Sequence, residues 1–212
     1  SSFIVLPDGG IYAVYFCGNN PLINARETID RKHLELPEKQ QELFDVIISI
    51  NPNAVLFLVS GYPYAITDKR ACSVMHISHA GPAMGYAVKR TLFGEVSPAG
   101  RCPVTWYKSA DELCDIKDYN IIRTKSTYLY YDGEPLFPFG YGLSYTTFRY
   151  GSVKTDKKTY ERDEEVTVTF DVENVGGCDS EEVVQLYVSE PKHLPYRPFR
   201  KLKAFARVFV PR

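Results

Sequence analysis

The 212-residue chain carries 25 basic and 26 acidic side chains, and its formal net charge of −1 gives it no general attraction for nucleic acid or for an anionic membrane surface. A hydrophobic fraction of 44 % and a charged fraction of 24 % are typical of an ordinary globular protein with a buried core. No apolar run approaches the roughly 20 residues of a membrane helix, and residues 1–10 lack the charged and apolar regions of a signal peptide, so we expect neither a nucleic-acid nor a membrane partner.

Apolar runs and helical patterns alternate in the first half of the chain. Residues 11–16 and 54–59 are almost wholly apolar and rich in β-formers, which is typical of strands buried on both faces of a parallel sheet. Between them, residues 36–53 predict a helix, with Pro37 in its first turn and Pro52 just beyond its end. The apolar face of this helix is expected to consist of Leu43, Val46, Ile47 and Ile50.

A third strand is predicted at 73–78, and a second helix at 82–94 with Gly94 as its C-cap. The alternation of strands with helices favours an α/β fold, in which an open, mostly parallel sheet is flanked by helices.

After residue 150 the apolar period changes to two, which indicates β-strands. In residues 165–172 one side of the strand carries Val166, Val168, Phe170 and Val172. Residues 183–191 and 201–210 are further strand candidates. The pattern is that of a β-sandwich, but only about four strands fit where about seven are usual. We therefore expect a truncated sandwich, or one that a partner completes.

A long charged connection joins the first strand to the first helix. Residues 18–36 read GNNPLINARETIDRKHLEL, which is unusually long for an α/β unit, and ligands of such sheets bind at the carboxyl ends of the strands. One of its carboxylates could donate and accept a proton in catalysis. The spacing by itself favours a solvated loop with surface ion pairs.

Other polar residues give weaker signals. His76 and His79 lack the neighbours of a metal site and are expected to be hydrogen-bonded histidines at a strand end. Ser60 does not lie in the elbow motif of a serine hydrolase, and no glycine pattern fits a dinucleotide or phosphate loop. The five cysteines are scattered and free of CxxC spacing, which predicts free thiols and a cytoplasmic location. We expect no metal and no cofactor.

Several segments in a fixed order resemble one known family. They are residues 18–43, with E-x-x-D-R followed by L-x-LP; 51–66; 81–107, with LFG and SPAGR; and 134–148, EPLFPFGYGLSYTTF. In this order they resemble the C-terminal α/β sandwich domain of glycoside hydrolase family 3, in its β-xylosidase and β-glucosidase branch. The resemblance implies that 1–148 is this domain, with its N-terminal part missing. Residues 149–212 then resemble an incomplete fibronectin type III-like domain.

The family resemblance implies a retaining mechanism, in which a nucleophile and a separate acid/base act on oligosaccharides or aryl β-glycosides that end in xylose or glucose. The position matching the family's acid/base is Glu27. Many relatives carry a second acid where this chain has Ala25. Asp30 and Arg31 are expected to bind the substrate, or to hold the loop through an ion pair.

The family's nucleophile lies on a preceding (β/α)8 barrel, for which 212 residues are too few because such barrels take about 250. The chain is therefore expected to be part of a larger enzyme, with this barrel as its partner, and to be inactive in isolation. Two alternatives are a non-catalytic carbohydrate-binding or structural module, and a subunit that assembles with a separate barrel chain. The first residue is Ser rather than Met, which favours a fragment.

Overall fold

The structure is a computed structural model that describes residues 2–5, 9–20, 22, 25–26, 28–67, 70–191, 194 and 196–212. The chain divides into two compact units, which are described separately. Unit 1 comprises Ser1–Met84, Cys102–Phe139 and Lys192–Phe199, and unit 2 comprises Gly85–Arg101, Gly140–Pro191 and Arg200–Arg212.

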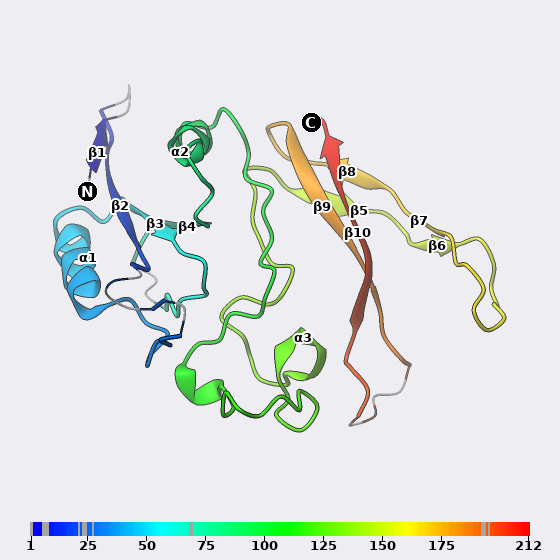
Figure 1. Cartoon of the computed structure of the whole chain (residues 1–212). Coiled ribbons are helices and arrows are strands. Elements are labelled where there is room, and N and C mark those ends of the chain that lie inside the picture. The colour runs from blue at the N-terminus through cyan, green and yellow to red at the C-terminus, as the bar shows by residue number, and fades with distance from the viewer. Residues whose placement is uncertain are drawn as a thin grey trace. The chain divides into compact units, whose positions relative to one another are not determined.

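Unit 1 is built on an open four-stranded sheet (Figure 1). Its order is β1 (Ser2–Val5), β2 (Ile11–Gly18), β3 (Ala54–Val59) and β4 (Ser73–Ile77). The last three strands are parallel, and β1 pairs antiparallel at the edge. The predicted α/β class and its three strands are thus confirmed, whereas β1 was not predicted.

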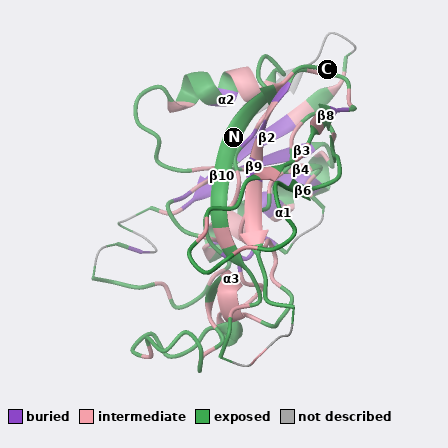
Figure 2. Cartoon of the chain, turned by 90° about the vertical axis from the view of Figure 1, so that its right-hand side faces the viewer, coloured by how far each residue is buried: buried purple, intermediate pink, exposed green. Residues whose placement is uncertain are grey.

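The helix α1 (Glu38–Ile50) packs on one face of this sheet beside β2 (Figure 1). The Tyr15 and Phe44 rings stack with their centroids 6.2 Å apart. Almost every side chain of β3 is buried, as its unbroken apolar run predicts (Figure 2).

The predicted apolar face of α1 is correct at Ile47 and wrong at its other three positions. The structure buries Phe44, Ile47 and Ile48. Leu43, Val46 and Ile50 are instead exposed, by 46, 55 and 73 %.

Two hydrogen bonds explain why α1 buries this face rather than the predicted one. The Gly18 amide donates to Gln40 Oε1, and Gln40 Nε2 donates to the Gly18 carbonyl, each at 2.9 Å. This pair turns Gln40 toward β2. Residues four, seven and eight positions later then share its face, and these are Phe44, Ile47 and Ile48.

The second long helix, α2 (Met84–Leu92), ends as the sequence predicts. Gly94 has a φ of +71°, its amide donates to the Thr91 carbonyl, and the Glu95 amide donates to the Arg90 carbonyl. These bonds form a Schellman cap, which confirms the predicted C-cap. A 3-10 turn η1 (Ala110–Glu112) and the short helix α3 (Thr127–Tyr130) follow. Within the described ranges no helix has the length and apolarity needed to cross a membrane.

Beyond residue 147 the described strands pair only antiparallel. The pairs are β5 (Phe148–Tyr150) with β8 (Val172–Asn174), β6 (Lys154–Thr155) with β7 (Val168–Thr169), and β9 (Ser180–Val188) with β10 (Lys201–Val210). β10 is exposed along most of its length (Figure 2). The predicted β-rich region is confirmed, and its fibronectin type III-like identity stays a prediction.

The predicted alternation holds in part of this region. Val168, Phe170 and Val172 are less exposed than the polar residues between them, but Val166 is 46 % exposed. The single strand expected there is divided into β7 and β8.

The glycine-rich run 137–148 is largely irregular backbone. Gly140 has a φ of +82°, which side-chain-bearing residues rarely adopt. Gly142 is needed for another reason, because a Cβ there would collide with the Gly100 carbonyl oxygen. Gly140 therefore allows a tight turn of the backbone, while Gly142 allows two backbone segments of unit 2 to approach closely.

Candidate active site

The carboxyl ends of β2 and β3 meet at one edge of the sheet in unit 1. The Asn19 amide donates to the Val59 carbonyl at 3.2 Å, and the Gly61 amide donates to Asn19 Oδ1 at 3.3 Å. The long charged connection begins directly after β2, and residues 60–66 follow β3. Both segments therefore start at the edge where α/β sheets bind ligands.

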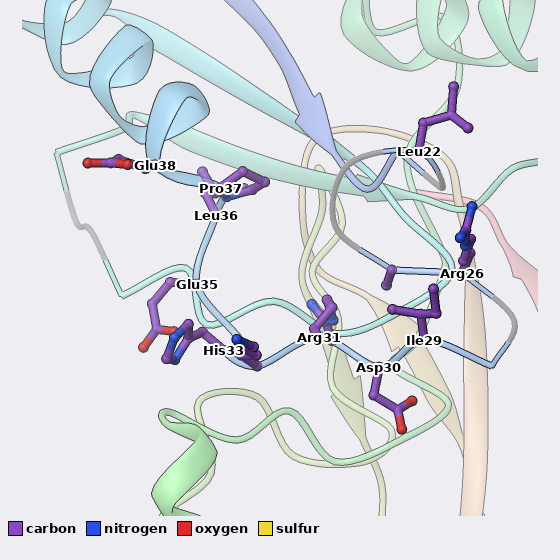
Figure 3. Close-up of a pocket in the computed structure, with 12 residues that line it drawn as sticks. Leu22, Arg26, Ile29, Asp30, Arg31, His33, Glu35, Leu36, Pro37 and Glu38 are labelled. Atoms are coloured by element: carbon purple, nitrogen blue, oxygen red, sulfur yellow. The ribbon is translucent and has the colours of Figure 1, made fainter.

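The long connection lines a cavity of about 470 Å³, formed by twelve residues between Leu22 and Glu38 (Figure 3). This volume lies in the range of small-molecule sites. Ala25 and Leu36 are buried in its wall, whereas Asp30 and His33 are exposed. Such a mixture of apolar surface with hydrogen-bonding groups suits a polar ligand such as a sugar.

Arg31 is anchored at the wall of this cavity. Its Nη2 donates to the Pro63 carbonyl at 2.8 Å. Its guanidinium lies over the ring of Tyr64, 4.5 Å from the centroid, and over that of Tyr62, at 5.3 Å. Its Nη1 is buried and has no hydrogen-bond partner in the described part of the chain. Arg31 thus ties the connection after β2 to the segment after β3.

Asp30 is placed differently from Arg31. It is exposed, and its carboxylate points away from the Arg31 guanidinium (Figure 3). No ion pair joins these two residues, both of which the structure describes. The expected ion pair between Asp30 and Arg31 is therefore not present. The carboxylate of Asp30 is accessible from solvent.

Glu27 lies outside the described residues, but the backbone on both sides of it is defined. Arg26 and Ile29 exchange two backbone hydrogen bonds, of 3.2 and 3.0 Å. Thr28 has a φ of +70°, which is unusual for a β-branched residue, and such strained residues cluster at functional sites. Ala25 is only 8 % exposed, so a carboxylate at this position would be largely buried.

The two strand-end histidines are hydrogen-bonded, as the sequence predicts. His76 Nε2 donates to the Ser60 carbonyl at 2.9 Å, and its ring meets the Trp106 ring edge-on at 5.0 Å. His79 Nε2 lies 3.0 Å from Asn19 Oδ1. No cluster of three potential metal ligands occurs among the residues that the structure describes.

Sequence reasoning missed two aromatic residues, Tyr62 and Tyr64, which hold Arg31. The sequence feature that could have indicated them is their position directly after β3, which ends at the carboxyl edge of the sheet. Their contact with Arg31 spans more than 30 residues and has no local pattern.

A pH titration tests the environment of His76. Packing takes its imidazole partly out of water, which lowers its pKa below the ordinary value, while the bond to Ser60 opposes this change. As the pH is lowered, His76 therefore becomes protonated at a higher pH in the unfolded chain than in the folded chain. The contribution of His76 to stability is lost as the pH falls below about 6.5. The fluorescence of Trp106, the single tryptophan, is expected to titrate with a midpoint below this value.

His76→Gln removes the titrating ring beside Trp106 and is expected to abolish this transition. His79→Gln is the matched control and is expected to preserve it. A midpoint at or above about 6.5 would show that the imidazole is not desolvated.

The fold is that of an α/β domain with a cavity beside its sheet, and comparisons with known proteins give its family. Residues 11–145 match the Glycosyl hydrolase family 3 C-terminal domain. The chain belongs to glycosyl hydrolase family 3 and contains the C-terminal domain of that family. The predicted family resemblance is thereby confirmed.

Named relatives agree with this assignment. The chain is 35 % identical over 201 residues to thermostable beta-glucosidase B of Acetivibrio thermocellus. The matched region covers 87 % of this chain and 26 % of that protein. It is 32 % identical over 196 residues to a periplasmic beta-glucosidase of Salmonella typhimurium, with 87 and 26 % covered. The chain thus spans about a quarter of the length of these relatives.

Solved structures show the same relationship. The beta-glucosidase of Kluyveromyces marxianus, determined in complex with glucose, superposes with a TM-score of 0.82 at 29 % identity. The superposition covers 94 % of this chain and 25 % of that one.

Proposed function

We propose that the chain is the C-terminal part of a retaining β-glycosidase that removes terminal glucose or xylose from the non-reducing ends of oligosaccharides or aryl β-glycosides. The observation that carries the proposal is the cavity at the carboxyl edge of the sheet, formed by the connection that contains Glu27, Asp30 and Arg31. Membership of family 3 and the beta-glucosidase names of relatives support it.

In the proposed reaction this part of the enzyme supplies the acid/base. A carboxylate on the preceding (β/α)8 barrel attacks the anomeric carbon while the bond to the leaving-group oxygen breaks, and Glu27 gives its proton to that oxygen. The Glu27 carboxylate then takes a proton from water, whose oxygen attacks the anomeric carbon and releases the nucleophile. Closure of the loop against the barrel would desolvate Glu27 and raise its pKa, as a general acid requires.

Arg31 and Asp30 are proposed to bind the substrate beside Glu27. Nη1 of Arg31 has no partner among the described residues and can donate to a sugar oxygen, because the rest of the guanidinium is already fixed by Pro63 and Tyr64. The exposed carboxylate of Asp30 can accept hydrogen bonds from sugar hydroxyls. No cofactor is needed for this chemistry.

The domain limits and location belong to the same proposal. We assign 1–148 to the α/β sandwich domain and 149–212 to an incomplete fibronectin type III-like domain. All five cysteines are free thiols, which suits a reducing compartment and hence the cytoplasm. The Salmonella relative carries the name periplasmic, so measuring the location of the full-length enzyme tests this part directly.

The stereochemistry of hydrolysis tests the proposed function. The full-length enzyme containing this chain is expected to release the β-anomer of the sugar first from an aryl β-glucoside or β-xyloside, as followed by proton NMR. The isolated chain is expected to give no turnover, because it lacks the nucleophile. Initial release of the α-anomer would contradict a retaining mechanism, and turnover by the isolated chain would contradict the division of the two catalytic groups. A full-length protein that binds sugars without hydrolysing them would be a carbohydrate-binding module instead.

A further inference from the structure

The side chain of Asn19 joins the segments that follow all three parallel strands of unit 1. Asn19 comes directly after β2, and its Oδ1 accepts a hydrogen bond from the amide of Gly61, which follows β3, at 3.3 Å. The same oxygen lies 3.0 Å from Nε2 of His79, which follows β4. An amide oxygen carries no hydrogen, so Nε2 is the donor in this second bond. A single acceptor thus bonds to the segments after both neighbouring strands.

The segment after β3 is itself fixed to the sheet. Ser60 is fully buried, and its amide donates to the Ile77 carbonyl of β4 at 3.0 Å. Its hydroxyl donates to the Tyr62 carbonyl at 2.8 Å. The bond between Gly61 and Asn19 therefore ties the beginning of the long connection to a segment that the sheet already holds in place.

The connection contacts the same segment a second time through Arg31. Its Nη2 donates to the Pro63 carbonyl, as described above, so residues 19 and 31 of the connection are bonded to residues 61 and 63. Surface loops whose two ends lie close together form compact units of their own. The connection is thus held at two points, on residues that are only two positions apart in the segment after β3.

Six of the twelve residues that line the cavity come from the part of the connection between these two points (Figure 3). They are Leu22, Ala25, Arg26, Ile29, Asp30 and Arg31. The shape of this wall therefore depends on where both ends are held. Because the two bonds of Asn19 are exposed to solvent, their loss is expected to change the position of the connection more than the stability of the fold.

We propose that Asn19 is a positioning residue for substrate binding in the cavity. It fixes the start of the cavity-lining connection relative to the ends of β3 and β4, and it acts through Gly61 and His79 rather than by touching the ligand. This role rests on the proposed function, in which the cavity binds the substrate. An acceptor is required at this position because both neighbours donate, and leucine has the same branched shape but provides none.

Two substitutions of similar shape test this role in the full-length enzyme. Asn19→Leu removes the acceptor and is expected to lower kcat/KM for an aryl β-glucoside or β-xyloside about tenfold, in line with the loss of ordinary hydrogen bonds. Asn19→Asp keeps the acceptor and is expected to recover most of this activity. Asn51→Leu is the matched control and is expected to leave kcat/KM unchanged. Asn51 Nδ2 donates to the Ile11 carbonyl at the opposite end of β2, and Asn51 is not among the residues that line the cavity.

Hydrogen exchange gives a readout that does not depend on catalysis. The Gly61 amide is expected to exchange faster in Asn19→Leu than in the wild type. The Tyr62 amide is the internal reference, because it donates to Ser60 Oγ at 2.9 Å and is expected to exchange as before. In a double-mutant cycle, His79→Ala is expected to lower kcat/KM no further once Asn19→Leu is present, because both substitutions break the same bond.

Unchanged kcat/KM for Asn19→Leu, or unchanged exchange at Gly61, would overturn the positioning role. Faster exchange at both Gly61 and Tyr62 would also overturn it, because it would show a general loss of stability. If Asn19→Leu does not fold, the same comparison with Asn19→Ala decides. A wild-type full-length enzyme that hydrolyses neither glycoside would overturn the proposed function together with this role, whereas an active wild type with an unimpaired Asn19→Leu variant would overturn the role alone.

Discussion

Replacing Glu27 by Ala in the full-length enzyme is expected to lower the hydrolysis of substrates with poor leaving groups by about 10²- to 10⁴-fold, the usual contribution of a general acid/base. A substrate with a good leaving group needs no proton donor, so it is expected to form the glycosyl-enzyme at a nearly normal rate. Breakdown of that intermediate then becomes slow, because no base activates water. Stopped-flow measurement of a burst followed by slow turnover checks this result.

Glu35 provides the matched control for Glu27. It is a carboxylate of the same connection, and it lines the cavity. Glu35→Ala is expected to change the same rates by less than about tenfold, as expected for a residue without a proton-transfer role. If Glu35→Ala shows the burst and Glu27→Ala does not, the acid/base has been assigned to the wrong residue of this connection.

Glu182→Ala is expected to reduce the free energy of unfolding by about 3–5 kcal/mol, because it leaves a buried cation unpaired. Arg101 Nη2 lies 2.5 Å from Glu182 Oε2, and the two side chains are only 13 and 9 % exposed. The Tyr150 hydroxyl donates to the other carboxylate oxygen at 2.7 Å. Burial and this carboxylate raise the pKa of Tyr150 well above its usual value. Urea unfolding of the chain, followed by circular dichroism, measures the change.

The neighbouring residue Glu181 makes a matched control for Glu182. It pairs with Arg207 at 2.9 Å, but both side chains are about half exposed. Glu181→Ala is expected to cost no more than about 1 kcal/mol, since solvent screens such pairs. If the two variants lose the same free energy of unfolding, the Arg101–Glu182 pair is not shielded from solvent in unit 2.

The parallel strands of unit 1 and the end of α2 could be predicted because their signals are local. The runs 11–16 and 54–59 are too apolar for a surface, and Gly94 supplies the left-handed conformation that ends α2. The face of α1 that is buried against the sheet could not be predicted, because the helix carries two neighbouring apolar faces. The choice between them depends on the bonds of Gln40 to Gly18, which lies on another element.

The candidate site was predicted from motifs rather than from spacing. The charges in the connection after β2 are equally typical of a solvated loop, and only the family resemblance singled out Glu27, Asp30 and Arg31. The anchoring of Arg31 could not be foreseen, because Pro63 and Tyr64 lie on the segment after the next strand. Tyr62 was missed for the same reason, since a tyrosine after a strand has no distinctive pattern until its neighbours are known.

Azide rescue of Glu27→Ala tests most directly whether this chain supplies the acid/base. Azide is a nucleophile that needs no general base, so it can attack the glycosyl-enzyme where water cannot. On an aryl β-glycoside with a good leaving group, the full-length variant is expected to regain turnover with azide and to form the β-glycosyl azide. Normal turnover without azide, or the absence of any glycosyl azide, would contradict the assignment of Glu27 as the acid/base.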